Sequence, residues 1–276
     1  MENNEILTKR EREVINKKLN NLRLNQQDSN YLSRFVRPKL KAMKQINPDY
    51  LLNRLNYNPA SRAIEQKIIK LVLKNIQKTH SVIIVGSAIQ TNYSNYRDID
   101  IIIITKKKYW DREIEKIRLC SKIEEEAKRD NLILDVQIIS KKAFLNGYQS
   151  SPSLIYQLKD SKVIYGKIKI PNKINLSKMD LRMKLDWSDI EKYAEPKEIY
   201  NALRNTILVK LLMNKIIDNS RLRQEVKEKL GEELINHLKS NRLTRLEKKY
   251  ALEYLKNLTE QTRKEVINAK WERIKI

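Results

Sequence analysis

The sequence predicts an α+β protein in which a mixed β-sheet domain lies between an N-terminal helical segment and a C-terminal helical bundle. Two observations support this fold class. The middle of the chain alternates helical patterns with short β-branched runs, whereas both flanks carry apolar residues at three- and four-residue spacings. The predicted segments are residues 1–55, 56–171 and 172–276.

The first segment has the spacing of amphipathic helices. Its first helical stripe comprises Ile6, Leu7, Val14, Ile15, Leu19 and Leu22. A second helix is expected to begin near Tyr31 and to be interrupted near Pro38.

The middle segment opens with Asn58-Pro59, which is typical of a helix cap followed by proline at the first helical position. After this helix, the pattern predicts in order strand 81–85, strand 98–105, helix 111–130, strand 132–140 and a short strand 163–166. This order indicates a mixed sheet with helices on one face.

The last segment is expected to begin with a linker at 171–177 and to continue as helices. Apolar periodicity predicts them at 199–217, 221–239 and 243–276. These helices are expected to form a bundle that packs onto the sheet domain.

The composition favours an anionic partner. The chain has 276 residues, with 57 Lys and Arg against 34 Asp and Glu, and a formal net charge of +23. The basic residues occur in all three segments and do not form a detachable tail. This distribution favours a phosphate-rich polymer or an anionic surface over a cationic ligand.

Several common sites and locations are excluded. The four glycines are far apart, so neither a Walker phosphate loop nor a dinucleotide-binding glycine loop is present. A single cysteine, Cys120, and two distant histidines cannot build a usual zinc site. The charged N-terminus lacks a secretory signal pattern and no apolar run could cross a bilayer, so we expect a reducing, cytoplasmic location and no membrane partner.

Three aspartates carry the expected chemistry. Asp98 and Asp100 are two residues apart, so on a strand both carboxylates leave the same face and repel each other unless a cation is bound. Asp135 lies inside an apolar strand pattern, where an unpaired charge is costly. If the two strands are neighbours, the three carboxylates meet at one sheet edge and offer the oxygen ligands that a hard divalent metal prefers.

A Gly-Ser dipeptide precedes these aspartates. Gly86 allows the backbone to turn at the end of the first strand and lets a ligand approach closely. Ser87 is expected to begin a short helix whose N–H groups favour a phosphate. Ten residues then separate this dipeptide from Asp98.

The five residues together resemble the signature of the nucleotidyltransferase superfamily, which has the DNA polymerase beta-like fold. Gly86, Ser87, Asp98, Asp100 and Asp135 match it position by position, and the resemblance covers roughly residues 60–166. The chain departs from many members after Gly-Ser, where they have a basic residue and a glycine. It also resembles toxin-type members that modify transfer RNA.

The resemblance implies transfer of a nucleoside monophosphate from a nucleoside triphosphate such as ATP to an acceptor hydroxyl. Asp98, Asp100 and Asp135 would bind Mg²⁺ or Mn²⁺ and act in catalysis, and Gly86 and Ser87 would bind the nucleotide. Because the chain is strongly basic, the expected acceptor is RNA, including transfer RNA. Toxin-type members also imply an antitoxin partner.

Other interpretations compete with this one. A small antibiotic is an alternative acceptor, although a cationic aminoglycoside would be repelled by so basic a protein. A non-catalytic nucleic-acid-binding module on the same fold is a further alternative. Among single residues, Arg97 is expected to pair with a neighbouring aspartate, and Tyr93 and Tyr96 are expected to be exposed loop tyrosines, with base stacking as the alternative.

Overall fold

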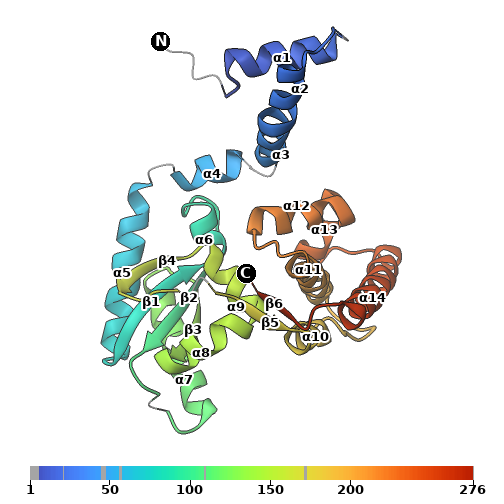
Figure 1. Cartoon of the computed structure of the whole chain (residues 1–276). Coiled ribbons are helices and arrows are strands. Elements are labelled where there is room, and N and C mark those ends of the chain that lie inside the picture. Colours follow the sequence, from blue (N-terminus) through green and yellow to red (C-terminus); the bar gives the residue numbers. More distant parts are fainter. Residues whose placement is uncertain are drawn as a thin grey trace. The chain divides into compact units, whose positions relative to one another are not determined.

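The computed structural model describes residues 6–20, 22–44, 48–55, 58–108, 110–170 and 173–275. The chain divides into two compact units, residues 1–49 and 50–276 (Figure 1). None of the described helices combines the length and apolar character needed to cross a bilayer.

The smaller unit is helical, as the sequence predicts. It contains α1 (Lys9–Leu19), α2 (Gln26–Tyr31), the π-helical turn η1 (Leu32–Val36) and α3 (Arg37–Lys44). Its core is formed by Val14, Leu32 and Val36. The expected start near Tyr31 is wrong, because α2 begins at Gln26. Near Pro38 the helical stretch is not broken: η1 leads directly into α3, and the irregularity is a π-helical turn just before the proline, which has no N–H to donate back along the helix.

The sheet of the larger unit is mixed, as expected. Its strands are β1 (Thr79–Val85), β2 (Ile99–Thr105), β3 (Leu134–Ser140) and β4 (Lys162–Gly166). Their order across the sheet is β3-β2-β1-β4. Strands β2 and β3 are parallel, whereas β1 is antiparallel to both of its neighbours.

Helices cover both faces of this sheet, so the expectation of helices on one face is wrong. One face packs on α5 (Pro59–Asn75) and α7 (Glu113–Arg129). The other packs on α8 (Lys141–Gly147), α9 (Pro152–Lys159) and the C-terminal helices. The reason lies in β2, where apolar side chains occupy both faces of the strand beyond Asp100.

The remaining elements are a helix before α5 and two short helical turns. Helix α4 (Pro48–Leu55) precedes α5, whose cap is confirmed because the Asn58 side chain accepts a hydrogen bond from the N–H of Ala60. Short turns α6 (Ser87–Gln90) and η2 (Tyr148–Ser150) follow β1 and α8.

The C-terminal region forms a helical bundle whose core is continuous with that of the sheet. Its helices are α10 (Lys178–Asp186), α11 (Pro196–Met213), α12 (Asn219–Leu230), α13 (Glu232–Ser240) and α14 (Arg245–Asn268). The continuous core fixes these helices against the sheet face that carries the aspartates (Figure 1).

Two details of the bundle differ from the sequence prediction. The helix expected at 221–239 is two helices, because Gly231 adopts a positive φ of 75° between them. The last helix ends at Asn268, and the chain then forms β6 (Arg273–Lys275), which pairs with β5 (Asn175–Ser177). Strand β5 occupies the end of the expected linker, of which residues 171 and 172 lie outside the described residues.

Candidate active site

Strand pairing brings the predicted carboxylates together. Asp100 on β2 is the register partner of Asp135 on the parallel strand β3, and of Val85 on the antiparallel strand β1. Directly paired residues of neighbouring strands point to the same face of a sheet. Asp98 lies one residue before β2 and two before Asp100. Asp100 and Asp135 therefore lie side by side on the face that the bundle covers.

Gly86 lies directly beneath the Asp100 carboxylate. A Cβ built on Gly86 would overlap Oδ2 of Asp100, and the backbone there has φ 75° and ψ −153°. Only glycine adopts this conformation readily. The Gly-Ser turn and the second aspartate of the Asp-x-Asp pair are thus in close contact, and Ser87 begins α6 immediately afterwards.

The environment disfavours the charge of Asp100. Burial, followed by the nearby Asp135 and Asp98 carboxylates, raises the pKa of this carboxyl to about 6, against the opposing effect of Arg204 and Arg97. Carboxylates that interact this strongly are stabilised by a bound cation. Asp98 and Asp135 are therefore close enough to Asp100 for their charges to raise its pKa.

Asp98 is held by its neighbour. The Arg97 guanidinium donates to Oδ2 of Asp98 from Nη2 at 2.7 Å and from Nε at 3.2 Å, which confirms the expected pairing. Within the described part of the chain, no three His, Cys, Asp or Glu side chains are gathered closely enough to hold a metal ion. The donor chemistry of the aspartates fits a divalent cation, provided that Asp98 turns away from Arg97.

A cavity of about 230 Å³ opens beside Gly86, between the sheet and the bundle. Its walls include Gln90 of α6, Tyr156 of α9, Lys184 of α10 and Arg204 of α11, and no carboxylate lines it. Among the described residues, no hydrogen bond or ion pair is found for Lys184 or Arg204. The two cations therefore face a cavity that adjoins the carboxylates.

The same cavity carries an excess of positive charge that burial makes costly. Burial lowers the pKa of Lys184 to about 8, with a smaller contribution from Arg204. Burial also lowers the pKa of the Arg204 guanidinium, and the nearby Arg223 acts in the same direction. Arg223 of α12 donates a hydrogen bond to Oε1 of Gln90, which links the bundle to α6. Half-buried cations without an ion-pair partner among the described residues indicate an anionic ligand.

The loop before the aspartates is held by internal contacts. Tyr93 is buried, and its hydroxyl donates to Oε1 of Glu65 at 2.8 Å. The Asn58 side chain donates to the carbonyl of Asn92 at 2.8 Å. The expectation of an exposed Tyr93 is wrong, because its ring packs in the core on the α5–α7 face. Its ring therefore has a structural role.

Lys184 and Arg204 are the site residues that the sequence interpretation missed. Arg204 carries a detectable signal: it lies four residues before the buried Leu208, on a helix whose other core-facing positions are apolar except Thr206. A lone charge at such a position requires a partner or a ligand. Lys184 carries no comparable signal, since its helix has charged residues on several sides.

Comparisons with known proteins bear on the fold. No protein-family model matches the chain, and no curated protein matches it in sequence. Among solved structures, it is similar to spectinomycin adenyltransferase AAD(9) from Enterococcus faecialis, solved with ATP and spectinomycin. The TM-score is 0.50 at 17% sequence identity, over 72% of this chain and 99% of that one. This chain has the nucleotidyltransferase fold. The fold that the sequence resemblance implied is thus confirmed.

Two toxin–antitoxin structures also match part of the chain. One is the tri-AMPylated HEPN toxin of Shewanella oneidensis with its MNT antitoxin, matched over 39% of this chain and 73% of that one, with 25% identity and a TM-score of 0.27. Another, a toxin–antitoxin structure with AMP-PNP, has 26% identity and a TM-score of 0.28, over 37% of this chain and 73% of that one. At these TM-scores, neither supports a conclusion about this chain.

Proposed function

We propose that this protein transfers a nucleoside monophosphate from a nucleoside triphosphate to an acceptor hydroxyl, with RNA as the acceptor. The observation that carries the proposal is the contact between Gly86 and Asp100, with Asp135 in register beside them and a cationic cavity adjoining them. The carboxylates of this arrangement suit a divalent cation, and the cationic cavity suits phosphates.

The cavity cations supply the binding site for the triphosphate. Lys184 and Arg204 face the cavity that Gly86 lines, and Arg223 reaches the same region through Gln90. A triphosphate would neutralise these charges in a partly dehydrated site, where ionic hydrogen bonds are strongest. The C-terminal bundle thereby completes a site that the sheet begins.

The residues then have separate roles in the reaction. Asp98, Asp100 and Asp135 would hold a divalent cation, which neutralises charge on the phosphates and acidifies the acceptor hydroxyl. The acceptor oxygen forms a bond to the α-phosphorus as the bond from that phosphorus to the bridging oxygen breaks, and pyrophosphate leaves. Asp135, which is exposed, would take the hydroxyl proton. Lys184 and Arg204 stabilise the charge of the departing pyrophosphate.

The net charge of +23 supports RNA as the acceptor. A polyanion gains affinity from many weak phosphate contacts, whereas a cationic small molecule would be repelled from the same surface. The proposal includes transfer RNA as a substrate, and an antitoxin partner stays a prediction of the family resemblance alone.

A small-molecule acceptor is the second candidate. It is favoured by the similarity to AAD(9), a protein whose solved structure holds ATP and spectinomycin and which is matched over 99% of its length. If this chain modified such a compound, the acceptor would have to bind outside the cationic cavity, since no carboxylate lines it.

The experiment that tests the proposal offers both acceptors. The protein is incubated with each labelled nucleoside triphosphate, Mg²⁺ and either total RNA or spectinomycin, and the products are analysed by mass. We expect label on RNA with the wild type and none with Asp98→Ala/Asp100→Ala. Label on spectinomycin alone would establish the second candidate, and label on RNA that persists in the double variant would refute the assignment of the site.

Nucleotide binding is expected to be accompanied by proton uptake at Lys184. With a pKa of about 8 in the empty cavity, this amine is half protonated at pH 8, and a bound triphosphate raises its pKa and completes its protonation. Calorimetry at pH 8 in buffers of different ionisation enthalpy should therefore show uptake of about half a proton. The Lys184→Arg variant should bind with about half a proton less uptake, whereas equal uptake by both proteins would exclude this role for Lys184.

A further inference from the structure

The small N-terminal unit has a strong excess of positive charge. Residues 1–49 contain 11 Lys and Arg against 6 Asp and Glu, and all 11 of the basic residues but only 3 of the acidic ones lie within 6–44. The unit lies outside the region that resembles a nucleotidyltransferase, and nothing in the catalytic proposal uses it. Its charge therefore needs a separate explanation.

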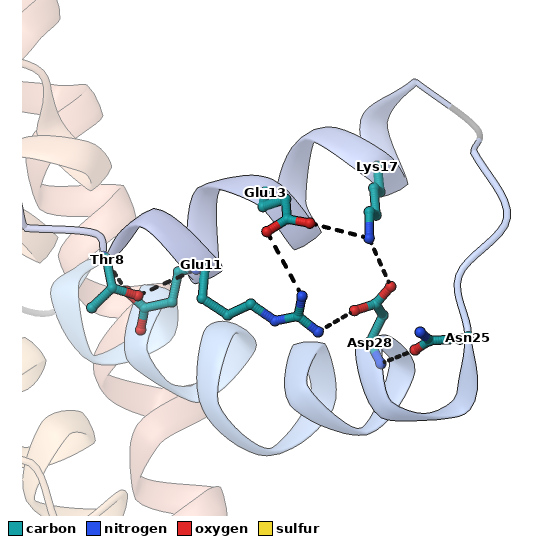
Figure 2. Close-up of polar contacts among 7 residues, drawn as sticks. Thr8, Glu11, Glu13, Lys17, Asn25 and Asp28 are labelled. Atoms are coloured by element: carbon teal, nitrogen blue, oxygen red, sulfur yellow. Dashed lines mark hydrogen bonds and ion pairs between the residues drawn. The ribbon is translucent and has the colours of Figure 1, made fainter.

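The three acidic residues within 6–44 all hold helices of this unit together. Asp28 is buried and bonds Arg10 Nη2 at 2.5 Å and Lys17 Nζ at 3.2 Å, and Glu13 pairs with Lys17 at 3.3 Å (Figure 2). Glu11 caps α1 through Thr8 (Figure 2) and also pairs with Lys39 at 2.8 Å.

The internal ion pairs use only a few of the cations. Six basic side chains of the unit are exposed and have no acidic partner among the described residues: Lys9, Lys18, Arg23, Arg34, Arg37 and Lys41. Arg37 and Lys41 lie four residues apart on α3 and share one face of it, and Arg34 lies one turn earlier in η1. A cationic row thus runs along one continuous helical stretch.

An exposed aromatic ring lies on the same helical stretch, on a face next to that of the row. Phe35 is 57% exposed, although it sits between buried residues of the unit's core in sequence. Its ring centroid is 5.2 Å from that of Tyr31, and Tyr31 is itself covered by the Arg10 guanidinium. Phe35 is therefore backed on one side by a second ring and open on the other. An exposed ring on a cationic helical unit is suited to stacking with an unpaired base.

The arrangement suits RNA better than a membrane surface. A helix that lies in a bilayer interface needs a continuous apolar face toward the lipid. In this unit the apolar residues Val14, Leu32 and Val36 are buried against one another. The exposed Ile6, Leu19 and Leu22 lie at or beyond the ends of α1 rather than along its middle turns. The exposed Phe35 and Leu40 are five residues apart on η1 and α3, a spacing that does not make one continuous apolar stripe.

We infer that the N-terminal unit is an RNA-docking element that binds the phosphate backbone through Arg34, Arg37 and Lys41 and stacks an unpaired base on Phe35. This inference deepens the proposed function, since it names the part of the chain that captures the RNA acceptor. Binding and catalysis can still be tested apart, because the docking residues are far along the chain from the aspartates.

The test measures the affinity of the full-length protein for fluorescent transfer RNA and for unstructured RNA, without nucleotide or metal. The variant Arg34→Gln/Arg37→Gln/Lys41→Gln is compared with Arg245→Gln/Lys249→Gln/Lys256→Gln, which removes the same charge from exposed positions of α14. We expect the first variant to weaken binding by about 10- to 100-fold and to reduce the slope of log affinity against log salt by about 2, since each lost phosphate contact removes roughly 0.7. The second should change affinity less than about threefold.

Phe35→Ala separates stacking from charge. We expect it to weaken binding to unstructured RNA by about tenfold with the salt slope unchanged. The circular dichroism of every variant should match that of the wild type, because all the altered side chains are exposed.

Two outcomes would overturn the inference. The first is equal loss of RNA affinity in the two charge variants, which would mean that overall charge alone binds RNA. The second is unchanged RNA affinity in Arg34→Gln/Arg37→Gln/Lys41→Gln; if this variant has also lost binding to anionic phospholipid vesicles, the surface is assigned to membranes. If instead the wild type binds RNA through this unit but transfers no nucleotide, the docking inference stands and the proposed function fails.

Discussion

Replacement of Asp100 by asparagine is expected to abolish nucleotidyl transfer while making the protein more stable at neutral pH. The lost carboxylate removes a cation ligand from the centre of the proposed site, so we expect activity to fall at least a thousandfold, or by about 4 kcal/mol of transition-state stabilisation. Activity is measured with saturating nucleoside triphosphate and Mg²⁺ on the acceptor identified for the wild type.

The gain in stability follows from the raised pKa of Asp100. Its pKa is about 6 in the folded protein against 3.8 ordinarily, so the folded state binds the proton more tightly. The free energy of unfolding therefore falls as the pH rises from about 4 to about 6, and the cost persists above pH 6. Asparagine avoids this cost. Allowing for partial exposure of the group, we expect a gain of about 1–2 kcal/mol at pH 7.5 that disappears near pH 4.

A matched variant makes this prediction specific. Asp130→Asn removes an exposed aspartate from the end of α7 and should change both activity and stability little, by less than about 0.5 kcal/mol. Chemical denaturation at pH 7.5 and pH 4 measures the difference. An Asp100→Asn protein that is less stable than the wild type at pH 7.5 would show that Asp100 is not under electrostatic stress.

Replacement of Gly86 by alanine is the second large effect that we expect. The new Cβ would overlap the Asp100 carboxylate, and the backbone at this position has a positive φ of 75° that alanine adopts only with strain. Backbone strain of about 1–3 kcal/mol adds to the cost of displacing Asp100, which we expect to be about 1–3 kcal/mol. Because Asp100 must move, activity should fall at least about a hundredfold in the protein that remains folded.

Two other glycines separate strain from overlap. Gly231 has the same φ of 75° but no atom within 4 Å of an added Cβ. The Gly231→Ala variant should therefore be less stable only by the energy of backbone strain, and it should keep its activity. Gly147 has an ordinary helical φ and also has open space, so alanine there should be neutral or slightly stabilising. Thermal unfolding and transfer assays on the three variants give the comparison. Equal activity of Gly86→Ala and Gly231→Ala would contradict the close contact on which the site depends.

The sequence predicted well those features that depend on local pattern. The β-branched runs identified the strands, and the two-residue spacing of Asp98 and Asp100 placed both carboxylates on one face, because strand periodicity is a local property. It also suggested Asp135 as a partner. The register that sets Asp135 beside Asp100 required the structure, since nothing local to either strand specifies it.

The features that depend on distant packing were missed. Lys184 and Arg204 reach the site only because the bundle packs on the sheet face that carries the aspartates. The buried position of Tyr93 likewise depends on Glu65, which is 28 residues away in α5. Periodicity shows that a helix has an apolar face but does not show which surface covers it.

The most direct test of the central claim is a crystal structure of the wild-type protein with Mn²⁺ and a non-hydrolysable nucleoside triphosphate. We predict anomalous density for manganese in contact with the carboxylates of Asp98, Asp100 and Asp135, with Asp98 released from Arg97 and the phosphates near Lys184 and Arg204. The account would be contradicted if the manganese bound away from these aspartates. It would also be contradicted if the phosphates of the nucleotide bound outside the cavity beside Gly86.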